Sequence, residues 1–184
     1  MRDTYTKAAA VAVPLVEGVR DDQLDAATPC TKFRVRDLLN HLFQVAVEFQ
    51  KAARAEDMDF ADQPDHLNGD WRGRFATEVD ALAEAWSQPG AMELDNSQMG
   101  FSRAVVARMP AFDLIVHGWD LARATGQPFD PDPVIVDEMY AMALQLADRG
   151  RKAEQFGPIV PVPDDAPVVD KLLGYLGRDP AWRP

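Results

Sequence analysis

Apolar residues recur at steps of three and four along residues 35–55, and this pattern constrains the fold more than any other feature of the sequence. Residues at this spacing share one face of an α-helix. The stretch therefore predicts a long amphipathic helix that must bury one side against other elements. The apolar positions are Val35, Leu38, Leu39, Leu42, Val45, Ala46 and Phe49.

Similar patterns predict helices over residues 4–19, 71–86, 102–125 and 131–150, and a short helix over 168–176. Pro14 should kink the first helix or split off its last turn, and Pro110 should either start the second half of helix 102–125 or bend it. Residues 21–32 and 56–70 read as loops, and residues 91–100, which show no clear pattern, could be extended. Several long helices with little strand signal predict an all-α fold, an antiparallel four-helix bundle.

The chain is long enough for one domain with a hydrophobic core and a short appendage. We expect a metal-binding helical bundle over residues 1–150. Residues 151–184 are then a C-terminal extension packed on the bundle, with extra helix and a proline-rich tail, because the prolines of stretch 156–163 forbid a helix. The tail, which carries Trp182, could pack on its own bundle or on a second copy, which would give a homodimer.

Composition excludes several classes of protein. The chain has 19 basic and 30 acidic residues, and its formal net charge of −11 would repel nucleic acid and anionic membranes alike. It lacks a signal-peptide core and an apolar run of about 20 residues, so we expect a soluble cytoplasmic protein. The single cysteine, Cys30, rules out an internal disulfide and a multi-cysteine zinc cluster. Metal ligands would have to be carboxylates and the three histidines, His41, His66 and His117.

The stretch 113–126 carries the clearest chemical signal. Asp113 and His117 are four residues apart, hence one helical turn apart on one face, where two side chains can hold one metal ion. If the helix that carries His41 packs beside this one, three ligands could meet at one level of the core. Two nitrogens and one oxygen would leave an open coordination position, as in catalytic zinc sites, although iron or nickel would also fit. Spacing alone is equally compatible with Asp113 and His117 as a pair on the helix surface. It is also compatible with His41 as an ordinary histidine at the edge of the apolar face.

Other residues in these stretches have more ordinary interpretations. Asp120 could hydrogen-bond a ligand histidine from the second coordination shell, but it could equally cap a loop or face solvent. Cys30 is expected to be a small buried residue, and His66 to be exposed in a polar loop. The acidic run of residues 56–65 is expected to be a solvated loop.

Motifs spread over nearly the whole chain resemble one family. It is the actinobacterial group of DinB-like metal-binding four-helix bundles related to the N-terminal domain of mycothiol-dependent maleylpyruvate isomerase. The motifs are Thr28-Pro29-Cys30, Phe33-x-Val35-x-x-Leu38-x-x-His41-Leu42, Asp113-x-x-x-His117-Gly118-Trp119-Asp120-Leu121-Ala122-Arg123-Ala124-Thr125-Gly126, Phe156-Gly157-Pro158 and Gly177-Arg178-Asp179-Pro180-x-Trp182.

The resemblance implies a metal site. Members of that superfamily bind a divalent metal through one histidine on the second helix and a His-or-Glu-x-x-x-His pair on the fourth, which correspond here to His41, Asp113 and His117. Asp113 is one methylene shorter than the usual Glu, so it would need a small helix shift or a bridging water to reach the ion. Phe33 stands where a Trp is common. The isomerase carries a further C-terminal domain for which this sequence leaves no room, so its particular reaction is not assigned here.

A metal with an open position lowers the pKa of a bound thiol from about 8.5, which gives a thiolate nucleophile near neutral pH. In the family that the chain resembles, the thiol is mycothiol. We therefore expect a divalent-metal-dependent transferase or isomerase, with zinc the first candidate metal, that uses a mycothiol-like thiol on a small-molecule substrate. The alternative is a non-catalytic bundle that binds metal or senses a ligand. Catalytic and substrate-binding residues are not predicted.

Overall fold

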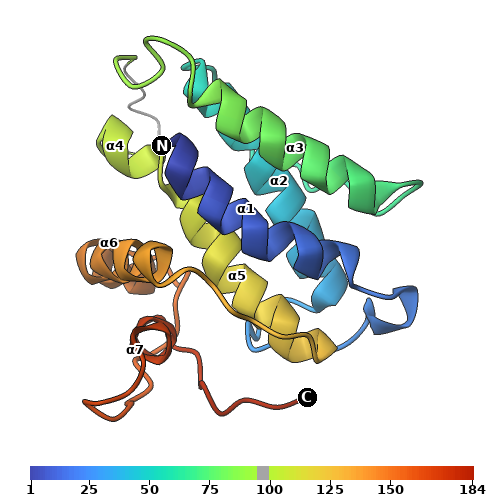
Figure 1. Cartoon of the computed structure of the whole chain (residues 1–184), viewed down its shortest axis with the longest axis vertical. Coiled ribbons are helices and arrows are strands. Elements are labelled where there is room, and N and C mark those ends of the chain that lie inside the picture. The colour runs from blue at the N-terminus through green and yellow to red at the C-terminus, as the bar shows by residue number, and fades with distance from the viewer. Residues whose placement is uncertain (95–99) are drawn as a thin grey trace.

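The computed structural model describes residues 1–94 and 100–184, and within these ranges its regular structure is helical (Figure 1). The described residues contain no strand, only an isolated bridge between Ala27 and Arg34. The prediction of an all-α fold is therefore confirmed. The helices are α1 (Arg2–Glu17), α2 (Val35–Ala53), α3 (Trp71–Ala85), α4 (Arg103–Val106), α5 (Met109–Thr125), α6 (Pro133–Lys152) and α7 (Val168–Tyr175), with a short 3-10 turn, η1, at Asp21–Gln23.

Helices α1, α2, α3 and α5 pack on one another around a common core. Helix α1 contacts α3 and α5, and α2 contacts the same two helices from another side. This packing is consistent with the predicted bundle. Burying each large apolar side chain contributes about 1.5–3 kcal/mol, so the shared core is the main source of stability. Fully buried members of that core include Leu39, Phe43, Phe75, Leu114 and Ile115.

Two prolines and one glycine bear on the lengths of α1 and α5. Pro14 lies inside α1, which runs on to Glu17, so its last turn is not split off. Pro110 lies in the first turn of α5, where its missing N–H costs nothing. The prediction that this proline starts the second half of the helix, and does not bend one continuous helix, is therefore confirmed. Gly126 ends α5 in the left-handed conformation, with φ of 72°.

The acidic loop of residues 56–70 is not merely solvated, because buried polar side chains of α2 hold it. The amide of Gln44 donates to the carbonyls of Asp59 (3.1 Å) and Asp62 (2.5 Å). The Glu48 carboxylate accepts from the backbone N–H of Asp59 (2.7 Å). The prediction of a loop here is confirmed, but the loop is docked against α2. After α3, residues 91–94 form turns, and the rest of the stretch expected to be extended, 95–99, lies outside the described residues.

The C-terminal part of the chain is organised around α6 and α7. Helix α6 packs mainly against α7 and has a smaller contact with α1 and α5 (Figure 1). The proline-rich stretch 156–163 forms no helix, as predicted, and Val160 donates its N–H to the carbonyl of Gly174 in α7 (2.9 Å). The division into a bundle over 1–150 and an extension over 151–184 stays a prediction. None of the described helices is long and apolar enough to cross a membrane.

Candidate metal centre

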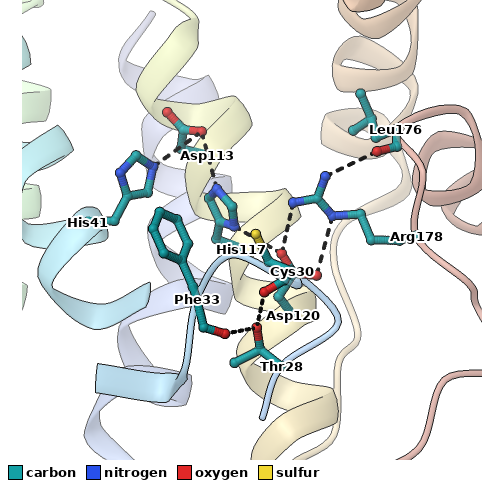
Figure 2. Close-up of polar contacts among 9 residues, drawn as sticks. All are labelled: Thr28, Cys30, Phe33, His41, Asp113, His117, Asp120, Leu176 and Arg178. Atoms are coloured by element: carbon teal, nitrogen blue, oxygen red, sulfur yellow. Dashed lines mark hydrogen bonds and ion pairs between the residues drawn. The ribbon is translucent and has the colours of Figure 1, made fainter. Parts of the chain in front are cut away.

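The three predicted ligands come together between α2 and α5 (Figure 2). Asp113 Oδ1 lies 4.0 Å from His41 Nε2 and 3.8 Å from His117 Nε2. One potential ligand atom from each of the three residues lies within 4.8 Å of the others. A zinc-sized ion bonded at about 2.0–2.2 Å would hold its ligand atoms roughly 3–4 Å apart. The donor set therefore fits a divalent ion with only a small contraction.

One side of this set is accessible to solvent. The side chains of His41 and Asp113 are each 26% exposed, whereas that of His117 is 10% exposed. The Phe33 ring lies beside both histidines, with ring centroids 5.4 Å from His41 and 6.1 Å from His117 (Figure 2). The hydroxyl of Thr28 lies 2.7 Å from the Phe33 carbonyl and so helps to hold this loop. The arrangement places an apolar wall next to a polar cluster that a small solute can reach.

Asp120 fixes the orientation of His117. Its Oδ2 lies 2.9 Å from His117 Nδ1, and its side chain is completely buried. An ionised carboxylate only accepts hydrogen bonds, so the proton belongs on Nδ1 and the lone pair of Nε2 points toward Asp113. Of the three interpretations of Asp120 that the sequence left open, the contact with a candidate ligand is the one observed. Carboxylate–histidine pairs of this kind orient metal ligands.

Arg178 completes the buried network, and sequence reasoning gave it no role. Its Nε donates to Asp120 Oδ1 (3.3 Å), its Nη2 to Asp120 Oδ2 (3.0 Å) and its Nη1 to the carbonyl of Leu176 (3.2 Å). Only 6% of Arg178 is exposed. The Gly-Arg-Asp-Pro motif was visible in the sequence, but nothing in it distinguishes a buried arginine from a surface one.

Charged and hydrogen-bonded neighbours keep Asp120 ionised, and burial keeps His117 neutral. Burial opposes ionisation of Asp120, yet the Arg178 guanidinium and the His117 hydrogen bond hold the pKa of this carboxyl below its usual value. Burial lowers the pKa of His117, against the opposing influence of Asp120. Neutral imidazole is the form that binds metals, so the folded chain presents His117 ready to ligate.

Gly177 allows Arg178 to turn inward. Its φ is +83°, a conformation that other residues rarely adopt. A β-carbon at this position would also lie 2.7–2.9 Å from backbone atoms of Gly157. The close approach of these two backbones therefore requires glycine at residue 177.

A second cluster, formed by Cys30, His117 and Asp120, also has ligand atoms within 4.8 Å of one another. It is a poor cation site, because Asp120 is already paired with Arg178 and the Nδ1 of His117 is engaged with Asp120. Burial raises the pKa of the Cys30 thiol, although Arg178 works in the other direction. Cys30 was expected to be buried, but it is only half-buried. The set that contains His41 is thus the better candidate for a metal.

His66 is not simply exposed, which corrects the expectation from sequence. Its ring stacks on Phe43, with centroids 5.1 Å apart and planes 10° apart, and its backbone N–H donates to Asn40 Oδ1 (2.7 Å). Its Nε2 is buried. Burial lowers the pKa of His66. These contacts tie His66 to α2 and to none of the three candidate ligands.

Comparison with known proteins gives a family match over the part of the chain that holds the candidate ligands. Residues 5–122 match the mycothiol maleylpyruvate isomerase N-terminal domain, a range that includes Asp120 but not Arg178. No solved structure matches the chain.

Two relatives from Mycobacterium tuberculosis are similar to the chain over most of its length. They are the uncharacterized protein MT0763 of strain CDC 1551 / Oshkosh and the uncharacterized protein Rv0738 of strain ATCC 25618 / H37Rv. Each is 29% identical over 167 residues, which cover 89% of this chain and 90% of the relative. Because the family match spans more than half of the sequence, the chain belongs to the mycothiol maleylpyruvate isomerase N-terminal domain family.

Proposed function

We propose that this protein is a divalent-metal-dependent enzyme of the DinB-like four-helix-bundle type, which uses a low-molecular-weight thiol such as mycothiol in a transferase or isomerase reaction. The observation that carries the proposal is the approach of His41 Nε2 and His117 Nε2 to Asp113 Oδ1, at 4.0 and 3.8 Å, on a side open to solvent. The family match supports the same class of chemistry.

The proposed ligands are His41, Asp113 and His117. Two neutral imidazoles and one carboxylate carry a single negative charge, so a divalent ion among them would keep a net positive charge that favours an anionic further ligand. Such an ion would lower the pKa of an incoming thiol and supply a thiolate at neutral pH. Asp113 Oδ1 is about equally far from both histidine nitrogens, which supports direct ligation despite the short side chain. Zinc is the first candidate, and nickel or iron suits the same donors.

The other residues of the site would orient the ligands and limit the access of water. Asp120 would hold the proton on His117 Nδ1 and leave Nε2 to the ion. Phe33 would give the thiol or the electrophile an apolar surface beside the ligands and limit the access of water. The partly exposed Asp113 and His41 mark the side from which a small-molecule substrate would enter. We place this chemistry in the cytoplasm, where a small thiol cofactor stays reduced.

Metal analysis and a thiol titration test the proposal. Protein prepared without a nickel column should contain one divalent ion per chain. The cobalt-substituted protein should gain a sulfur-to-cobalt charge-transfer band when mycothiol or another small thiol is added. Cys30→Ser is the matched control, because it removes the only thiol of the chain, so that any sulfur band must come from the added compound.

Two results would contradict the proposal in different ways. Absence of stoichiometric metal from the protein, both as purified and after incubation with Zn²⁺ or Co²⁺, would refute the metal site. Bound metal with an unchanged cobalt spectrum at saturating thiol would refute the thiol chemistry and favour the alternative, a non-catalytic bundle that binds metal or senses a ligand.

A further inference from the structure

We infer that Arg178 is a positioning residue that holds Asp120 against His117 and so couples docking of the C-terminal segment to metal binding by His41, Asp113 and His117. The inference rests on the proposed function, because it requires an ion at those three ligands. It goes further in naming a residue outside the family match, 58 positions along the chain from Asp120, as part of the control of the site.

The contacts form one unbroken series from the chain's last helix to the candidate metal site (Figure 2). Arg178 contacts both oxygens of Asp120, at 3.3 and 3.0 Å, and the second of these oxygens lies 2.9 Å from His117 Nδ1. The other ring nitrogen of His117, Nε2, lies 3.8 Å from Asp113. Every link between Arg178 and the candidate ligands is therefore a side-chain contact at hydrogen-bond or ion-pair distance.

The two-point contact fixes the orientation of the Asp120 carboxylate as well as neutralising its charge. A guanidinium that donates to both oxygens of a carboxylate sets the plane of that carboxylate as well as its position. Because Asp120 Oδ2 is shared between Arg178 and His117, rotation of the carboxylate would break a contact on one side or the other. Arg178 thus restricts the direction in which His117 Nε2 points, which a simple neutralising charge would not do.

The guanidinium is itself fixed to the end of α7. The backbone N–H of Arg178 donates to the carbonyl of Leu173 (2.9 Å), and its Nη1 donates to that of Leu176 (3.2 Å). Leu172 and Leu176 are buried in the same core cluster as the bundle helices. Movement of α7 away from the bundle would therefore pull Arg178 off Asp120 and leave a buried carboxylate without its counter-ion.

Linkage between the two events is reciprocal. If docked α7 favours the metal-binding orientation of His117, bound metal must favour docked α7 by the same factor. Two observable quantities follow, namely the metal affinity of Arg178 variants and the protection of α7 with and without metal. An arginine with only a structural role would affect stability, but it would not link metal affinity to the protection of α7.

The first test measures Co²⁺ and Zn²⁺ affinity by competition with a chromophoric chelator in the full chain. Arg178→Gln should weaken binding about 10–100-fold, the usual effect of losing an outer-shell partner of a metal ligand. Arg178→Lys, which keeps the charge but not the two-point contact, should recover only part of this loss. Arg183→Gln, an exposed arginine of the same segment, is the control and should bind like the wild type.

The double variant Asp120→Asn with Arg178→Gln replaces the ion pair by neutral groups and guards against misfolding of the single variants. Relative to Asp120→Asn alone, the added Arg178→Gln should change affinity by no more than about twofold, because Arg178 acts through Asp120. In the wild type, Zn²⁺ should slow hydrogen exchange in α7, and this slowing should be absent from the double variant.

The outcomes separate the two proposals. A wild-type protein that binds no metal would overturn both the proposed function and this inference. A wild-type protein that binds metal, with Arg178→Gln and Arg178→Lys at wild-type affinity, would overturn this inference and leave the proposed function standing. Equal slowing of exchange in α7 by Zn²⁺ in the wild type and the double variant would also overturn it.

Discussion

The two ring nitrogens of His117 face two unlike environments made of similar residues. On the Nε2 side lie Asp113 and His41, both about a quarter exposed. On the Nδ1 side lie Asp120, which is fully buried and paired with Arg178, and the half-buried Cys30. Ligand-type residues within reach of one another therefore do not suffice for a metal site. A site also needs uncommitted lone pairs and no competing cation, and only the Nε2 side offers both.

The largest effect on stability should come from the buried side. Asp120→Asn leaves the Arg178 guanidinium buried without its counter-ion, and we expect a loss of about 3–5 kcal/mol in the free energy of unfolding. Asp113→Asn, on the partly exposed side, should change the stability of the metal-free protein by only about 0–1 kcal/mol. Urea unfolding of both variants without metal gives the two values. Equal losses would show that the two sides of His117 do not differ in their contribution to stability.

The largest effect on metal binding should come from the residue that both sides share. His117→Ala removes a candidate ligand, and we expect affinity to fall by more than about 100-fold, beyond the range for loss of an outer-shell partner. Elemental analysis and cobalt titration of the purified variant measure this. Retained stoichiometric metal in His117→Ala would show that the ion binds elsewhere.

The pH dependence should distinguish the buried imidazoles from ordinary ones. Burial lowers the pKa values of His117 and His66, so the unfolded chain binds more protons than the folded chain below the ordinary histidine pKa of about 6.5. Stability of the metal-free protein should be fully present above about pH 6.5 and should fall, by at most about 1.4 kcal/mol per pH unit for each histidine, as pH drops through the folded pKa values.

Urea midpoints between about pH 7.5 and 5 check this trend, since carboxylates with ordinary pKa values titrate mostly below that range. His66→Gln serves as the control that isolates His117. If the urea midpoint of His66→Gln rose as the pH fell, His117 would not be held neutral by its surroundings.

The smallest effect should come from Cys30. Cys30→Ser removes a possible ligand of the Nδ1-side cluster only, so metal stoichiometry and affinity should be unchanged. The same chelator competition used for Arg178 provides the measurement. Marked loss of affinity would mean that the Cys30 cluster holds the ion, and the comparison between the two sides of His117 would have to be reversed.

Local patterns predicted the helices and the candidate ligands because both depend on short-range spacing. The period along residues 35–55 placed His41 on a helix, and the four-residue step placed Asp113 beside His117. Family resemblance then suggested that these two elements meet. The structure brings the three side chains together, and their role as ligands stays a prediction until a metal is measured.

What the sequence missed depends on contacts between distant segments. Arg178 pairs with Asp120, 58 positions away, and no periodicity in the sequence predicts such a contact. The docking of the 56–70 loop by Gln44 and Glu48 was missed for the same reason, because polar residues on a helix usually face water. The prediction for His66 was wrong because a polar loop gave no sign that its ring would stack on Phe43.

The backbone crossing at Gly177 offers a means of sorting relatives by sequence. Alanine or any larger residue there would strain the turn and collide with Gly157, so the arginine that follows would have to point elsewhere. A protein of this type that lacks glycine at the equivalent place would therefore have to orient its helix-borne imidazole by some other device, even where its three candidate ligands are all present.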